Sequence, residues 1–202
     1  MGSTNEPAVL VLASGNQGKL RELAGALADW PWQLRSQADY AVPEAVEDGL
    51  SFVENALIKA RNACEHTGLA ALADDSGLVV PALGGEPGIY SARYAGVGAS
   101  DQSNCQRLLD ALQGRSDRRA WFECVLVLMR HARDPSPLIA SARWHGEILR
   151  QPAGKGGFGY DPLFRPAGLS QSAAQMPADE KQRLSHRGQA VARLAGELRA
   201  EA

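Results

Sequence analysis

Two adjacent aspartates, Asp74 and Asp75, stand between two apolar runs in the segment LADDSGLVV, residues 72–80. Neighbouring carboxylates repel each other, and a divalent cation such as Mg²⁺ removes that cost because hard cations prefer oxygen ligands. The segment therefore indicates a metal-dependent site at the end of a strand. A plain acidic turn between two strands is the competing interpretation, since Asp, Ser and Gly also favour turns.

The composition is that of an ordinary globular protein. Its 202 residues fit one domain, or one domain with two lobes, and 45% of them are hydrophobic. A net charge of −2 argues against general binding to nucleic acid or to an anionic membrane. We find no membrane-spanning run and no signal peptide, so no membrane partner is expected. Three cysteines without a C-x-x-C pair argue against disulfides and structural zinc, and favour a reducing cytoplasm.

Strands and helices alternate early in the chain and a hairpin is expected later, which predicts an α/β fold with a mixed sheet. Strands are expected over residues 8–13, 69–73, 78–81, 121–129 and 138–149. Helices are expected over residues 19–29, 51–65, 100–112, 177–184 and 189–200. Ser51 and Glu54 predict a capping box. Ser100 is expected to cap the following helix, with Asp101 in its first turn, and Gly188 to break the last helical region.

A strand, the sequence SGNQGK and a helix together outline a phosphate cradle. Helix N-termini expose unpaired N–H groups, glycines allow close approach of an anion, and a lysine adds a full charge. The residues are Ser14, Gly15, Asn16, Gln17, Gly18 and Lys19. The segment is not a Walker A loop, because Ala13 and Leu20 stand where that motif needs Gly and Ser or Thr. An ordinary turn with Asn and Gly in left-handed conformations is equally consistent with the pattern.

The loop of residues 154–159 matches G-x-G-x-x-G in form only. Pro162 disfavours a helix at Asp161, so the dinucleotide-binding interpretation is rejected. An aromatic side chain on such a loop, Phe158, can stack on a base. Packing of Phe158 into the core is the alternative.

Several charged side chains are further candidates. Lys181, His186 and Arg187, next to Ser185 and Gly188, can hold a phosphate or read a carbonyl group; a solvated charged face with a glycine cap is the alternative. Lys59 lies at the edge of the apolar stripe of its helix, where it either points into a cleft or extends to solvent. Glu47 is either a metal ligand or a loop acid.

Six ordered blocks resemble the inosine triphosphate pyrophosphatase family, which acts on noncanonical purine nucleoside triphosphates. The blocks are SGNxGKxxE from Ser14, FVENAxxKA from Phe52, ADDSGL from Ala73, PGIYSARY from Pro87, GGFGYDP from Gly156 and SHRGQA from Ser185. The resemblance covers roughly residues 8–199. It implies an elongated α/β fold with two lobes around a long mixed sheet flanked by helices.

The resemblance also implies an activity and an organisation. The activity is Mg²⁺-dependent hydrolysis of ITP, dITP and XTP to the monophosphate and pyrophosphate, which keeps deaminated purines out of DNA and RNA. The organisation is a disordered tail over residues 1–7 and a single two-lobed domain over residues 8–202, working as a cytoplasmic homodimer.

Carried over by position, the resemblance assigns roles to individual residues. Asp75 is the proton acceptor and a metal ligand, and Glu47 is a second acidic ligand. The triphosphate is held by Ser14, Gly15, Asn16, Gln17, Gly18, Lys19, Lys59 and Ser76. The nucleoside and base are held by Phe158, Gly159, Tyr160, Asp161, Lys181, His186 and Arg187.

Three other functions compete with this one. A Maf-like pyrophosphatase would act on modified pyrimidine or 7-methylguanine triphosphates. A nucleotide-binding regulator would bind without hydrolysis, but the chain has both Asp74 and Asp75. A nucleic-acid-binding module is disfavoured by the net charge and by the lack of a basic stripe.

Overall fold

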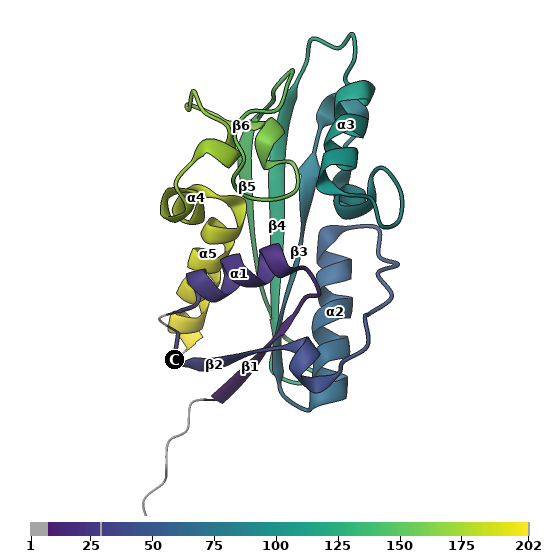
Figure 1. Ribbon diagram of the computed structural model, residues 1–202. Coiled ribbons are helices and arrows are strands. Elements are labelled where there is room, and N and C mark those ends of the chain that lie inside the picture. Colours follow the sequence, from purple (N-terminus) through teal and green to yellow (C-terminus); the bar gives the residue numbers. More distant parts are fainter. Residues whose placement is uncertain (1–7, 29, 202) are drawn as a thin grey trace, which may run out of the picture. The chain divides into compact units, whose positions relative to one another are not determined.

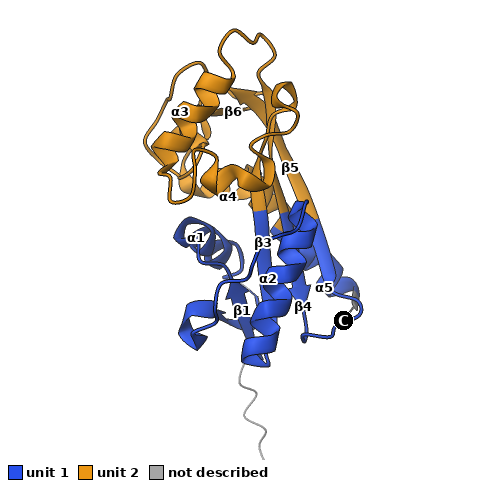
Figure 2. Ribbon diagram, turned by 90° about the vertical axis from the view of Figure 1, so that its right-hand side faces the viewer, with its two compact units in different colours: residues 1–75, 125–140, 191–202 blue, residues 76–124, 141–190 orange. Residues whose placement is uncertain are grey.

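The computed structural model describes residues 8–28 and 30–201, so the disordered tail expected over residues 1–7 lies outside it. The chain divides into two compact units (Figure 2). Unit 1 comprises Met1–Asp75, Val125–Ala140 and Val191–Ala202, and unit 2 comprises Ser76–Cys124 and Ser141–Ala190. Each unit has a hydrophobic core of its own.

The secondary structure confirms an α/β protein (Figure 1). The strands are β1 (Ala8–Ala13), β2 (Trp32–Ser36), β3 (Ala70–Val79), β4 (Arg119–Met129), β5 (Leu138–Ile148) and β6 (Phe164–Pro166). The helices are α1 (Gln17–Ala26), α2 (Phe52–Thr67), α3 (Asp101–Ala111), α4 (Ala178–Leu184) and α5 (His186–Glu201). A membrane span would need a longer and more apolar helix than any within these described residues.

The six strands form one mixed sheet in the order β2-β1-β3-β4-β5-β6. β1 pairs in parallel with both β2 and β3, whereas β5 pairs antiparallel with β6. In unit 1, α1 connects β1 to β2, which lies beside β1 in the sheet. α2 connects β2 to β3, which lies on the opposite side of β1. Because parallel crossovers are right-handed, α1 and α2 lie on opposite faces of this part of the sheet.

β3 differs from the sequence prediction. We expected two strands, over residues 69–73 and 78–81, with the aspartates at a strand end or in a turn. The structure has one continuous strand, so the acidic turn is wrong and the aspartates lie in mid-strand. Further along β3, the amide of Leu78 donates to the Ser91 hydroxyl at 2.8 Å.

The helices predicted from the sequence are present, but two of them begin earlier than predicted: α1 at Gln17 and α5 at His186. α1 begins at Gln17, with the Asn16 side chain accepting from the Lys19 amide, so Gln17 and Gly18 belong to its first turn rather than to a loop. Ser51 caps α2 as predicted. Glu54 does not complete the capping box, because its carboxylate accepts from the Leu50 amide and the Ser51 hydroxyl.

The last helical region breaks at Ser185, not at Gly188. Ser185 has an extended backbone with ψ of 160°, and α5 starts directly after it. Gly188 lies in the first turn of α5, where a Cβ would overlap the carbonyl group of Gln182. Gly188 is thus a packing residue that lets two consecutive helices approach each other.

Cys64, Cys105 and Cys124 are buried free thiols. Cys64 packs with Ala56 and Ala60 of α2 in the core of unit 1. Cys105 belongs to the core of unit 2.

We expect Gly188→Ala to lower the free energy of unfolding by about 1–3 kcal/mol, because the added methyl group has no space. Urea denaturation followed by circular dichroism measures this change. Gly196→Ala, on the same helix, is the control, since nothing lies within 4 Å of a Cβ there. Equal stability of the two variants would contradict the packing role of Gly188.

Candidate functional site

The two aspartates project from opposite faces of β3, because successive side chains of a strand alternate. Asp75 shares its face with Ala71 and Ala73, which pack against α2 in the core of unit 1. Asp74 projects toward the face that carries α1. Both carboxylates are buried. The strand therefore gives the two acids different surroundings although they are neighbours in sequence.

Lys59 of α2 connects two acids of unit 1. Its ammonium nitrogen lies 2.7 Å from Asp75 Oδ1 and 3.5 Å from Glu47 Oε1. The side chain of Lys59 is 12% exposed and that of Glu47 is 31% exposed. Lys59 thus points inward rather than to solvent, and Glu47 takes part in an ion pair rather than standing alone on a loop.

The electrostatics of this group reflect burial and charge together. Burial raises the pKa of Asp75 above its ordinary value, and the ammonium groups of Lys59 and Lys19 offset only part of that rise. Burial alone would lower the pKa of Lys59, but the carboxylates of Asp75 and Glu47 outweigh it and raise that pKa. Lys59 therefore stays charged at neutral pH.

The predicted phosphate cradle is the N-terminus of α1. Lys19 forms an ion pair of 3.0 Å with Asp74 Oδ1. None of the described residues from Ser14 to Lys19 has a positive φ, so the ordinary left-handed turn is wrong. A Cβ at Gly15 would lie 2.9 Å from Glu44 Oε1, so this glycine accommodates the close approach of a carboxylate.

Asp75 meets one requirement of a metal ligand. Its Oδ2 is buried and has no hydrogen-bond partner among residues 8–28 and 30–201. A buried carboxylate oxygen without a partner is costly, and a cation removes that cost. In the same part of the chain no three acidic, histidine or cysteine side chains gather as a metal cluster. Two carboxylates fit Mg²⁺, which one or two acids often hold together with substrate phosphates.

The second group of predicted residues lies in unit 2. Lys181 Nζ donates to Asp161 Oδ2 at 2.6 Å, and both side chains are less than 10% exposed. The half-buried ring of Phe158 lies 5.1 Å from Lys181 Nζ and 5.9 Å from the guanidinium carbon of Arg187. Gly157 has φ of 71°, and a Cβ there would overlap Asp161. The glycine-rich loop therefore closes around this carboxylate.

Arg187 and His186 are buried, so the solvated charged face is wrong. Arg187 is 2% exposed and donates to Ser76 Oγ at 2.8 Å. His186 stacks on Phe122, with ring centroids 4.9 Å apart and planes 12° apart. The side chains of His186 and Arg187 are therefore held in fixed positions before any ligand binds.

Two residues of the glycine-rich loop have partners that the motif did not indicate. Tyr160 is buried, and its hydroxyl donates to the Ser91 carbonyl oxygen at 2.8 Å. Gly159 donates its amide to Asp101 of α3. From the sequence, Asp101 is only a first-turn acid of a helix, because no local pattern connects two residues that are 58 positions apart.

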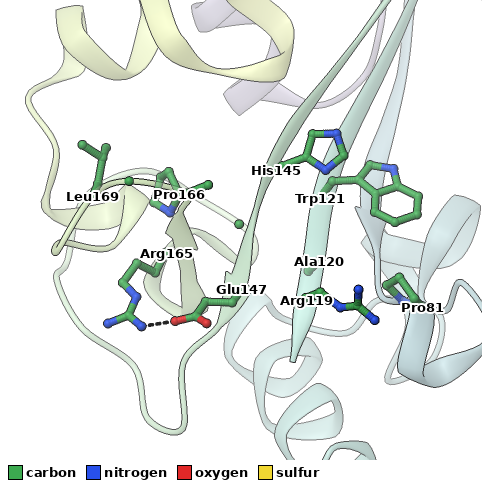
Figure 3. A pocket seen from close by; sticks show the side chains of 12 residues that line it. Pro81, Arg119, Ala120, Trp121, His145, Glu147, Arg165, Pro166 and Leu169 are labelled. Atoms are coloured by element: carbon green, nitrogen blue, oxygen red, sulfur yellow. Dashed lines mark hydrogen bonds and ion pairs between the residues drawn. The ribbon is translucent and has the colours of Figure 1, made fainter. Parts of the chain in front are cut away.

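A separate pocket in unit 2 contains none of the predicted site residues. It has a volume of about 620 Å³ and is lined by residues including Trp121, His145 and Leu169. Figure 3 shows Arg165 and Glu147 paired at its side. The predicted residues lie elsewhere: the cradle, Glu47, Lys59 and Asp75 are in unit 1, and Ser76 belongs to unit 2 with the residues from Phe158 to Arg187.

The fold and the two groups define an α/β protein whose buried acids are combined with lysines and an arginine. Cations at these positions can neutralise phosphate charge, and a carboxylate can orient a water molecule. Such a combination suits chemistry on a phosphorylated ligand.

The chain belongs to the Ham1 family, whose model matches residues 10–197. A dITP/XTP pyrophosphatase of Yersinia pestis is 55% identical over 192 residues, which cover 94% of this chain and 98% of that protein. The dITP/XTP pyrophosphatase of Escherichia coli strain K12 is 52% identical, with the same coverage of 94% and 98%. A solved HAM1 protein from Coxiella burnetii has a TM-score of 0.89 and 48% identity, covering 96% of this chain and 100% of that chain. These matches confirm the family resemblance.

We expect Lys181→Met to lower the free energy of unfolding by about 3–5 kcal/mol, because it leaves the buried Asp161 carboxylate without its cation. The double variant Lys181→Met/Asp161→Asn should recover part of that loss. Arg119→Met is the control, because the Arg119 side chain is 78% exposed in its pair with Asp117. Chemical denaturation of the ligand-free protein measures all three; no loss in the single variant would contradict the argument.

Proposed function

We propose that this chain hydrolyses ITP, dITP and XTP to the monophosphate and pyrophosphate, and so removes noncanonical purines from the nucleotide pool. Relatives more than 50% identical over nearly their whole length carry the name dITP/XTP pyrophosphatase. The observation that carries the proposal is the group of Lys59, Asp75 and Glu47, in which one ammonium holds two acids and Asp75 Oδ2 stays buried without a described partner.

Asp75 and Glu47 are the proposed ligands of Mg²⁺. When bound, Mg²⁺ lowers the pKa of a coordinated water molecule and neutralises phosphate charge. The protein contributes two acidic side chains, and Oδ2 of the buried Asp75 has no hydrogen-bond partner among the described residues. The remaining ligands are expected to be phosphate oxygens and water, which is the usual arrangement for this ion.

Asp75 is the proposed proton acceptor for the water that attacks the α phosphorus. Lys59 holds Oδ1 of this carboxylate, which restricts its rotation and fixes the direction of Oδ2. Lys59, Lys19 and the N-terminus of α1 are proposed to stabilise the negative charge that develops on the phosphates. The cradle from Ser14 to Lys19, together with Ser76, is proposed to contact the triphosphate.

The second group is proposed to recognise the nucleoside and its base. Phe158 offers an aromatic face for stacking, and Gly159, Tyr160 and Asp161 shape the loop that carries it. Arg187, with His186 and Lys181, supplies donors suited to the 6-oxo group of hypoxanthine and xanthine. Adenine has an amino group at that position, so a buried donor would remain unpaired and adenine would be disfavoured.

The organisation of the protein is part of the same proposal. Residues 8–202 are taken as one catalytic domain with two lobes, and the family match across residues 10–197 supports this because it spans both units. The active form is proposed to be a homodimer in the cytoplasm. Three buried free thiols agree with a reducing compartment.

A substrate panel tests the proposed function. Pyrophosphate release is measured from ITP, XTP, dITP, GTP, ATP and 7-methyl-GTP, with Mg²⁺ and with a chelator. We expect release from the first three only, and only with Mg²⁺. Preference for 7-methyl-GTP would support the Maf-like alternative, and tight binding without release would support a nucleotide-binding regulator.

We expect Asp75→Asn to lower kcat for ITP by about a hundredfold or more, because the proton acceptor is lost while the shape is kept. Cooperative thermal unfolding checks that the variant folds. Asp117→Asn is the control, since Asp117 is an exposed acid of unit 2 paired only locally with Arg119. Turnover like that of the wild type in Asp75→Asn would refute the assignment.

A further inference from the structure

The glycine-rich loop of unit 2 is attached to α3 at Gly159. Oδ2 of Asp101, in the first turn of α3, accepts a hydrogen bond of 2.7 Å from the Gly159 amide. One turn along α3, the Cys105 thiol donates to the Gly159 carbonyl oxygen, with 3.4 Å between sulfur and oxygen. Both backbone polar groups of Gly159 therefore bond to the same helix.

The preceding amide is held by a different carboxylate. The Phe158 amide donates to Asp161 Oδ2 at 2.9 Å, and the same oxygen accepts from Lys181 Nζ. The consecutive amides of Phe158 and Gly159 thus donate to two different carboxylates, Asp161 of the loop itself and Asp101 of α3. Because the orientation of a side chain follows its backbone, this pair of bonds sets the direction of the Phe158 ring, which lies beside Lys181 and Arg187.

The attachment at Asp101 matters because the loop is rich in glycine. Gly157 and Gly159 have φ values of 71° and 60°, and glycine has more backbone freedom than any other residue. Asp161 holds the Phe158 side of this segment, through the Phe158 amide and carbonyl, whereas α3 holds the Gly159 side. Without Asp101, the N–H of the peptide group between Phe158 and Gly159 would lose its acceptor, and the 3.3 Å bond from the Asp161 amide to the Phe158 carbonyl oxygen would hold only the other end of that group.

We propose that Asp101 is a positioning residue for recognition of the purine base. By accepting from the Gly159 amide, it holds the loop in the conformation in which the Phe158 ring can stack on the base. The inference rests on the proposed function, in which Phe158 contacts the base. Asp101 itself acts through the loop and touches no substrate.

The test compares Asp101→Ala with Asp101→Asn. We expect Asp101→Ala to raise KM for ITP about three- to tenfold with little change in kcat, because the same base is held in ground and transition states. Asp101→Asn keeps an acceptor oxygen without the charge and should keep KM within about twofold of the wild type. A rise in both variants would assign the effect to the charge of Asp101 near the helix N-terminus and would overturn the proposal.

Ser100→Ala is the matched structural control. The Ser100 hydroxyl caps α3 by accepting from the Ser103 amide at 3.1 Å, whereas the side chains bonded to Gly159 are those of Asp101 and Cys105. This variant should have a lower melting temperature and an unchanged KM. Hydrogen exchange of the Gly159 amide gives a readout independent of turnover. It should be fast in Asp101→Ala and slow in the wild type, Asp101→Asn and Ser100→Ala.

The outcomes separate this inference from the proposed function. An unchanged KM in Asp101→Ala, or an equal rise in Ser100→Ala, overturns the positioning role and leaves the hydrolysis intact. A wild-type protein that hydrolyses none of the triphosphates overturns the proposed function, and the inference with it, before any variant is made.

Discussion

Two lysines allow β3 to carry adjacent carboxylates through a buried part of the sheet. Asp75 and Asp74 each have an ammonium group within 3.0 Å, supplied by Lys59 and Lys19 respectively. Without these cations, two acids side by side would repel each other and would carry uncompensated charge away from water. The right-handed connections that place α2 and α1 on opposite faces deliver one lysine to each side.

This arrangement makes the two aspartates chemically distinct. Asp74 forms an ion pair with Lys19 of α1, which belongs to the phosphate cradle. Asp75 belongs to a group with a second acid, Glu47, and keeps one buried oxygen without a described partner. A single ion held by both neighbouring side chains is disfavoured by their opposite directions. The proposed catalytic role therefore falls on Asp75 for a geometric reason, in addition to the family resemblance.

Local patterns in the sequence predicted local structure well. The stripe and cap of α2, the cap of α3 and the apolar run of β4 depend on residues within a few positions of one another, so their signals are visible in the sequence. The continuity of β3 was missed because Asp, Ser and Gly favour turns when taken alone. The lysine that pairs with Asp75 lies 16 positions away, outside any local pattern.

The candidate site also divides into features that local motifs predict and features that depend on contacts between distant residues. Ordered motifs indicated the candidate residues, but the burial of Arg187 and of Lys181 depends on packing that no motif contains. Gly188 was expected to end a helix because glycine commonly does so. It instead gives room to the carbonyl of Gln182, a contact between segments that only the folded chain brings together.

The bond between Leu78 and Ser91 has a consequence for how this protein can vary through evolution. A neighbouring strand bonds through its backbone, so almost any residue can serve there. At Leu78 the acceptor is instead a side-chain hydroxyl from a residue 13 positions away. The identity of residue 91 is therefore restricted, because an apolar side chain there would leave the buried Leu78 amide without this acceptor. The backbone of β3 thus restricts the identity of Ser91, a residue outside the sheet.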